Sequence, residues 1–221
     1  MKSTLKMLAN RLPPHTLHKL RRAYFEHSIQ NGRFSADEPE YNILDQLVSP
    51  GSWVIDVGAN VGHYTHKLSE LVGPSGRVIA LEPVAETFRI LTSNSRLFAH
   101  NNVTLLNIAA SDKSSLTGIT VPSEGGQAIY YRAHLSLEET SSSVFCLPLD
   151  SLSLPVRIGL AKIDAEGHEL SVLAGMQGIL ERDRPVLIVE DSSPRIAEIL
   201  LPYGYRSRKL ANSPNIVCQV H

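Results

Sequence analysis

Short apolar runs alternate with segments of helical periodicity from residue 41 onward. Val-, Ile- and Leu-rich runs of this kind predict seven buried strands, at Trp53–Val57, Arg77–Leu81, Val103–Ile108, Gly159–Asp164, Pro185–Glu190, Tyr205–Leu210 and Ile216–Val220. Apolar residues at helical spacing predict helices over Glu40–Val48, Val61–Val72, Val84–Phe98, Gly167–Glu181 and Pro194–Leu201. This alternation predicts an α/β fold with a mostly parallel sheet and helices on both faces.

Two segments stand outside the alternation. Residues 1–36 read as an N-terminal helical extension, and 37–221 as the main domain. Residues from about 111 to 146 are rich in Ser, Gly and Thr and contain short β-like pieces, Gly118–Val121 and Ala128–Tyr131. A compact domain seldom carries so long a loop without using it, so we expect a hairpin insertion or lid there.

The N-terminal segment is basic. No acidic residue precedes Glu26, whereas six lysines and arginines lie among residues 1–22. One interpretation is a pair of helices, divided at Pro13-Pro14, that packs on the domain with its basic face in water. The other is a basic amphipathic anchor in residues 1–22 that makes weak contact with an anionic membrane surface or a lipid-linked substrate.

Composition narrows the partners and the compartment. The 221 residues can bury one sizeable core, and a net charge of −1 with 6% aromatic residues argues against nucleic acid as a partner. Cys146 and Cys218 have no metal-binding spacing, which favours a reducing compartment. Because no apolar stretch is long enough to cross a bilayer and no secretory signal is evident near Met1, we expect a cytoplasmic protein.

A glycine loop follows the first strand, and the spacing of its glycines indicates which class of ligand it binds. The loop contains Asp56, Gly58, Asn60 and Gly62. The dinucleotide fingerprint requires glycine at its third and sixth places, where this chain has Asn60 and His63, and no P-loop sequence follows. The Asp56 carboxylate would repel phosphates but suits a cationic amino group. S-adenosylmethionine (SAM), which carries an ammonium and a sulfonium, fits this loop.

Glu82 ends the second strand, 20 residues after Gly62. A carboxylate there can accept hydrogen bonds from both hydroxyls of a ribose. At the end of the third strand, small residues such as Ala110 could flank an adenine ring, and Asn107 or Asp112 could bond its amino group. Asp112 is equally suited to capping a turn. The alternative for the loop and Glu82 is a glycine-rich turn beside a surface glutamate.

A second cluster of polar residues ends the fourth strand, with Asp164, Glu166, His168 and Glu169 within six residues. His168 is a candidate general base that would take a proton from an acceptor hydroxyl, with Asp164 and Glu166 supporting it. The alternative is a surface histidine near a helix start, where Glu169 would serve the helix dipole. A divalent metal on Asp164 and Glu190 is possible but not favoured, and no metal ligand is predicted.

These motifs resemble the FkbM family of SAM-dependent methyltransferases. The resemblance runs from about Gly51 to Gly204 and rests on the segments 55–62, 80–83, 147–152, 162–169 and 184–190. It implies a Rossmann-like class I methyltransferase with a seven-stranded sheet whose last strand is antiparallel. It also implies SAM at Asp56, Gly58, Asn60 and Glu82, and O-methylation of glycans, polyketides or other secondary metabolites.

The predicted activity is therefore SAM-dependent transfer of a methyl group to a hydroxyl of a glycan, a lipid-linked sugar or a secondary metabolite. Predicted catalytic residues are His168, Asp164 and Glu166. Residues predicted to bind SAM are Asp56, Gly58, Asn60, Gly62, Tyr64, Glu82, Pro83, Asn107, Ala110 and Asp164. The alternatives are a SAM-dependent methyltransferase of RNA or protein, and a SAM-binding module without catalysis.

Overall fold

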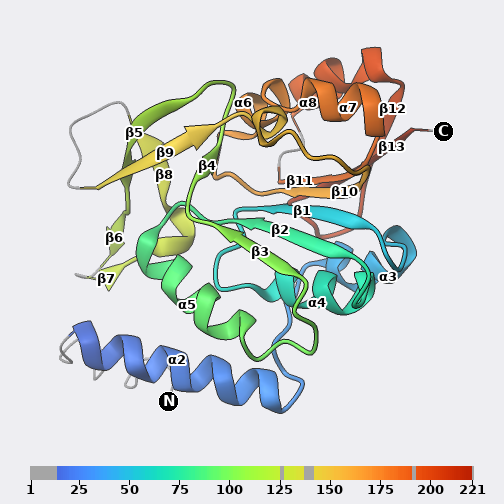
Figure 1. Ribbon diagram of the computed structural model, residues 1–221. Helices are drawn as coiled ribbons and strands as arrows, with labels where there is room; N and C mark the ends of the chain where they lie inside the picture. Colours follow the sequence, from blue (N-terminus) through green and yellow to red (C-terminus); the bar gives the residue numbers. More distant parts are fainter. Residues whose placement is uncertain (1–13, 125–126, 137–141, 191–192, 221) are drawn as a thin grey trace.

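A twisted seven-stranded sheet forms the centre of the molecule (Figure 1). The computed structural model describes residues 14–124, 127–136, 142–190 and 193–220. The strand order is β12-β13-β11-β10-β1-β2-β3. These strands are β1 (Trp53–Val57), β2 (Arg77–Leu81), β3 (Val103–Leu106), β10 (Ile158–Ile163), β11 (Val186–Val189), β12 (Tyr205–Lys209) and β13 (Ile216–Val220). β13 is antiparallel to both neighbours, and the other described strands of this sheet are parallel, which confirms the predicted fold class.

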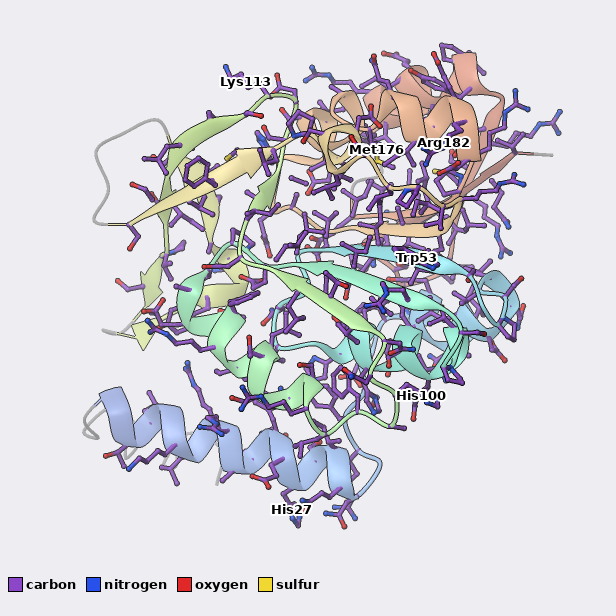
Figure 2. The ribbon with its side chains drawn as sticks, in the orientation of Figure 1. His27, Trp53, His100, Lys113, Met176 and Arg182 are labelled. Carbon is purple, nitrogen blue, oxygen red and sulfur yellow. The ribbon has the colours of Figure 1, made fainter. Side chains whose placement is uncertain are left out.

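Helices cover both faces of this sheet because successive strand residues point to opposite sides. Val54 of β1 packs in the layer with η1 (Pro39–Ile43), α3 (Leu44–Leu47), α4 (His63–Val72) and α5 (Ala85–Ser95). Its neighbour Ile55 packs in the layer with α6 (Glu169–Ala174), α7 (Gln177–Asp183) and α8 (Pro194–Leu200). Met176, between α6 and α7, is fully buried in this second layer (Figure 2).

Three predicted elements end or divide earlier than the sequence pattern indicates. The helix expected over Gly167–Glu181 divides into α6 and α7 around Gly175, where a Cβ would lie 1.9 Å from the main-chain oxygen of Ser111. The helix expected over Glu40–Val48 divides into η1 and α3. The strand expected over Val103–Ile108 ends at Leu106, after which the chain leaves for a second sheet.

The segment predicted as an insertion forms this second sheet, which has four strands in the order β4-β9-β5-β8. They are β4 (Ala109–Ala110), β5 (Ser115–Thr120), β8 (His134–Ser136) and β9 (Ser143–Leu147). A two-stranded ladder, β6 (Ser123–Glu124) and β7 (Gln127–Ala128), lies between β5 and β8 in the chain. The strand expected at Ala128–Tyr131 is wrong beyond Ala128, because Tyr130–Arg132 form the 3-10 turn η2. Cys146 is buried here and, like Cys218 in β13, is a free thiol.

The remaining elements are α2 (Pro14–Gln30), η3 (Leu149–Leu152) and η4 (Leu201–Tyr203). α2 lies alongside α5 at the edge of the molecule (Figure 1). The break predicted at Pro13-Pro14 falls at the boundary of the described residues. The helix expected before Pro13 lies outside the described residues. None of the described helices combines the length and the apolar character needed to cross a bilayer.

Candidate active site

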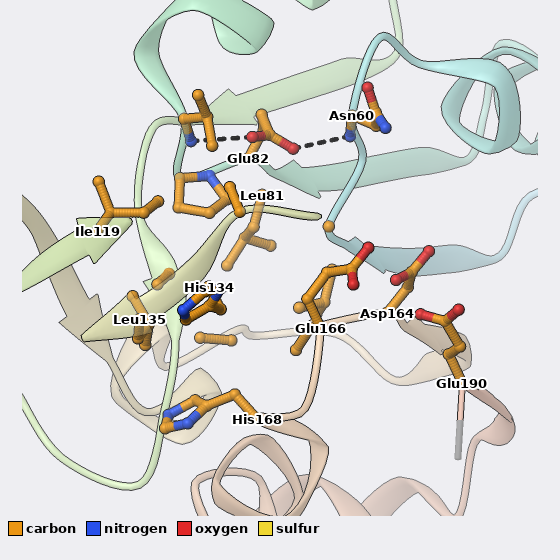
Figure 3. A pocket seen from close by; sticks show the side chains of 18 of the residues that line it. Asn60, Leu81, Glu82, Ile119, His134, Leu135, Asp164, Glu166, His168 and Glu190 are labelled. Atoms are coloured by element: carbon orange, nitrogen blue, oxygen red, sulfur yellow. Dashed lines mark hydrogen bonds between the residues drawn. The ribbon is translucent and has the colours of Figure 1, made fainter. Parts of the chain in front are cut away.

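A pocket of about 330 Å³ opens at the carboxyl ends of the parallel strands (Figure 3). Residues of the sheet edge form its floor: Val57, Gly58, Asn60, Leu81, Glu82, Pro83, Val84, Asp164, Ala165, Glu166, His168 and Glu190. Residues of the second sheet and its flanking turns form the facing wall: Ile108, Ala109, Ala110, Ile119, Tyr130, Ala133, His134 and Leu135. Glu38, which precedes η1, completes the lining. Open α/β sheets bind ligands at this edge.

Gly58 fixes the turn that leaves β1. Its φ of +73° lies in the left-handed region, and a Cβ on it would lie 1.8 Å from the main-chain oxygen of Asp164. Its N–H and that of Ala59 donate to the carbonyl of Leu81. Only glycine therefore allows β1, β2 and β10 to end close together under the pocket.

Glu82 is only 5% exposed, and its carboxylate organises the same edge. Oε2 accepts a hydrogen bond from the Asn60 N–H at 2.9 Å, and Oε1 accepts one from the Val84 N–H at 2.9 Å (Figure 3). Each oxygen retains a lone pair for a ligand. Burial raises the pKa of Glu82 to about 7, although both backbone hydrogen bonds oppose the shift.

Four residues expected to bind the donor do not line the pocket: Asp56, Gly62, Tyr64 and Asn107. Asp56 is fully buried and accepts a 2.6 Å hydrogen bond from the Thr65 hydroxyl. Tyr64 donates to buried Glu40 at 3.3 Å, and its ring lies 4.7 Å from the Lys162 ammonium. Both side chains therefore support the sheet edge from beneath the pocket.

The other two exceptions serve backbone packing. A Cβ on Gly62, which has a φ of +102°, would meet the Leu91 side chain at 2.7 Å, so the lack of a side chain here lets α5 pack closely. The Asn107 amide donates to the carbonyls of Glu82 and Pro83 at 2.8 and 3.1 Å. Asn107 therefore ties the end of β3 to the turn after β2, and small Ala110 is the expected residue that lines the pocket there.

Carboxylates from two strand ends meet on the other side of the pocket. Oxygens of Asp164, Glu166 and Glu190 lie within 4.8 Å of one another, a donor set that could hold a divalent cation or an ammonium group (Figure 3). Glu166 occupies the left-handed region, with a φ of +50°. Burial by itself would raise the pKa of Asp164, but Lys162, 2.7 Å away, lowers it. The hydrogen bond to Asp164 raises the pKa of Glu190 to about 9, so the pair shares one proton at neutral pH.

His168 lies at the start of α6 and reaches the pocket from the side of the second sheet. Its Nε2 is 2.9 Å from the Ser111 hydroxyl, which donates to Asp112 Oδ1 at 3.1 Å. A hydroxyl has a single proton, so this pattern favours a proton on Nε2 that is donated to Ser111. The Nδ1 lone pair is then the basic one. Asp112, expected either at the adenine or in a turn, holds Ser111.

Several lining residues were not identified from the sequence. Ile119 and Leu135 of the second sheet and Tyr130 of η2 have no motif, because only tertiary packing brings them over the strand ends. Glu38 lies in the segment before η1, for which the sequence predicts no site. The candidates that the structure does bring together in the pocket are Gly58, Asn60, Glu82, Pro83, Ala110, Asp164, Glu166 and His168.

Comparison with solved structures relates this architecture to methyltransferases. The FkbM methyltransferase of Methylobacillus flagellatus KT superposes with a TM-score of 0.56 at 18% identity, over 97% of this chain and 57% of that one. Aeropyrum pernix fibrillarin, solved with bound SAM, gives 0.52 at 14% identity over 79% and 68%. Precorrin-6y C5,15-methyltransferase of Geobacter metallireducens GS-15 gives 0.51 at 16% identity over 83% and 87%. At these identities the likeness shows the fold, that of class I SAM-dependent methyltransferases.

The family follows from the sequence itself. The model of the methyltransferase FkbM domain matches residues 56–207, more than half of the chain. This protein therefore belongs to the FkbM methyltransferase family and is a SAM-dependent methyltransferase of that type. No curated protein sequence matches it significantly.

Proposed function

We propose that this protein transfers a methyl group from SAM to a hydroxyl of a small or glycan-like acceptor. The observation that carries the proposal is that one pocket joins Glu82, the Asp164–Glu190 pair and His168. Glu82 suits the ribose of SAM, the Asp164–Glu190 pair suits its ammonium, and His168 suits the hydroxyl proton of the acceptor. A pocket walled by a second sheet suits a small molecule better than an RNA or a protein surface.

In this proposal SAM lies across the strand ends. Glu82 accepts the ribose hydroxyls with its free lone pairs, and Ile108, Ala109 and Ala110 flank the adenine. The amino-acid tail rests at the turn of Gly58, with its ammonium near the Asp164 carboxylate. This arrangement needs no metal ion, because the carboxylates and the ammonium neutralise one another.

Methyl transfer then requires an acceptor oxygen in line with the carbon–sulfur bond. The oxygen forms a bond to the methyl carbon, the carbon–sulfur bond breaks, and its electron pair stays on sulfur as a neutral thioether. His168 Nδ1 takes the hydroxyl proton, and Ser111 holds the imidazole in the necessary tautomer. Glu166, which also lines the pocket, stabilises the imidazolium by its charge.

Calorimetry with SAM and a labelled-methyl screen against cell extract test the activity together. We expect SAM to bind and label to enter a small product as an ether, which survives mild alkali. Label in RNA, in protein or in a base-labile ester would contradict the proposed acceptor class. Tight SAM binding without transfer to any fraction would instead favour a non-catalytic module.

Replacing His168 with alanine should lower turnover about 100-fold, the lower end of what a general base contributes. SAM affinity, measured by calorimetry, should stay unchanged, because His168 contacts the acceptor side of the pocket. Ser111→Ala should lower turnover less, since it removes only the group that holds the tautomer.

His100→Ala, on the loop before β3, is the matched control and should retain full activity. A His168→Ala enzyme that keeps wild-type turnover would exclude the histidine as the base and leave Glu166 as the candidate.

Adenosine binding should depend on pH through Glu82. Adenosine has the ribose but no amino-acid tail, so its affinity isolates this carboxylate. The ionised form accepts both hydroxyls, and the pKa of Glu82 is about 7. Affinity should therefore be full at pH 8 and fall about tenfold by pH 6, as the carboxylate takes up a proton. Glu82→Gln should flatten this profile, and an equally steep profile in that variant would contradict the assignment.

A further inference from the structure

Helix α2 has one side that packs on the domain and, among the described residues, one side that is exposed. Its inner residues Leu17, Phe25 and Ile29 are half-buried, and the Phe25 ring makes an edge contact with Phe34 at 5.8 Å between centroids. This side already holds the helix on the domain. Packing on the domain therefore does not explain the apolar residues that the opposite side exposes.

The opposite side combines apolar and basic residues. Leu20 is 52% exposed and Tyr24 is 68% exposed, and their spacing of four residues places them next to each other on the helix surface. Lys19, Arg22 and Ala23 are exposed around them. We call these five residues the outer face of α2. Glu26 is the single acidic residue of the helix.

Charge identifies the occupant that suits this face. The outer face offers two cations beside its apolar pair, and Lys2, Lys6 and Arg11 add three more positive charges upstream in the sequence. The whole chain nevertheless has a net charge of −1, so the positive charge is concentrated at this end. A helix with leucine and tyrosine flanked by lysine and arginine suits the interface of an anionic bilayer, where apolar side chains enter the headgroup region and cations meet lipid phosphates.

We propose that the outer face of α2 binds an anionic membrane surface. Docking also bears on the active site, because the Arg21 guanidinium lies 5.4 Å from the ring centroid of Tyr130, which lines the pocket. The docked helix therefore adjoins a residue of the second-sheet wall of the pocket. This second step rests on the proposed function, and it assigns the acceptor to molecules presented at a lipid surface. Docking itself does not depend on methyl transfer.

Vesicle flotation of the full chain tests the docking. We expect the protein to float with vesicles that contain phosphatidylglycerol and not with pure phosphatidylcholine, and to be released by high salt. The double variant Lys19→Ala/Arg22→Ala should bind about 30-fold more weakly, since each basic residue near such a surface contributes a factor of about five. Leu20→Ser/Tyr24→Ser should also weaken binding.

The matched control is Arg206→Ala/Arg208→Ala, which removes two exposed arginines from β12, an edge strand of the central sheet. This control should float like the wild type. All these residues are exposed, so unchanged thermal unfolding is expected in every variant. Calorimetry with SAM separates the two proposals, because the α2 variants should keep wild-type SAM affinity whether or not they float.

Three results would overturn the docking proposal. They are equal flotation with neutral vesicles, wild-type flotation of Lys19→Ala/Arg22→Ala, and no flotation of the wild type. In the last case, a concentration-dependent dimer lost in Leu20→Ser/Tyr24→Ser would assign the outer face to a second copy of the chain.

Discussion

Replacing Glu82 with alanine is expected to weaken SAM binding about 100-fold. Two charge-assisted hydrogen bonds to the ribose would be lost, together worth about 3 kcal/mol. The substitution also leaves the N–H groups of Asn60 and Val84 without the hydrogen bonds that they donate to this carboxylate in the wild type. Titration calorimetry with SAM measures the effect, and thermal unfolding measures how much of it comes from loosening of the loop.

Two comparisons make this test specific. Glu86→Ala removes an exposed carboxylate in the first turn of α5, four residues after Glu82, and should leave SAM affinity unchanged. Glu82→Gln keeps one acceptor oxygen and should lie between alanine and the wild type. Wild-type SAM affinity in a folded Glu82→Ala protein would remove the ribose from this position and require another orientation of the donor.

The sequence predicted the sheet well because periodicity and strand burial arise from local patterns. Each predicted strand of the central sheet is present, and the segments that end in Gly58, Glu82 and Asp164 converge at one edge. Convergence follows from parallel topology, which the alternation of strands and helices already implied. The polar residues at these strand ends were therefore predictable as neighbours.

The direction of individual side chains was not predictable in the same way. Asp56 and Gly58 are two residues apart, yet Asp56 lies beneath the pocket and Gly58 lines it. The sequence does not distinguish a glycine needed for close approach of a ligand from one needed for close packing of a helix. Gly62 lies against the Leu91 side chain of α5. The facing wall was equally hidden, since its residues come from a second sheet joined to the first by packing rather than by any motif.

Lys162 is the residue whose role was missed most clearly. The sequence showed it only as part of a motif, but its side chain is 5% exposed and lies beneath the pocket. Its ammonium contacts Asp164 at 2.7 Å, and the Tyr64 ring covers it at 4.7 Å. Asp56 of β1 is the register partner of Lys162 in the neighbouring strand β10. Asp56 Oδ1 has no hydrogen-bond partner among the described residues. The buried Lys162 ammonium thus stabilises the negative charge of both Asp164 and Asp56.

Lys162→Met should accordingly lower the free energy of unfolding at pH 8 by about 3–5 kcal/mol, the effect of removing one partner of a buried ion pair. The deficit should shrink as the pH falls. In the wild type Asp164 has a lowered pKa, so its contribution is present above the pKa of an unfolded aspartate and is lost in acid. In the variant both carboxylates would have raised pKa values, and protonation at lower pH would relieve their uncompensated charge.

Urea unfolding at pH 8 and pH 5 measures this difference, with Lys113→Met in an exposed turn as the matched control (Figure 2). The control should lose little stability at either pH, because its ammonium is solvated and supports no buried carboxylate. A deficit in Lys162→Met that is independent of pH would mean that the lysine acts by packing alone. A deficit confined to high pH, together with weaker SAM binding, would show that this cation keeps Asp164 ionised for the ammonium of the donor.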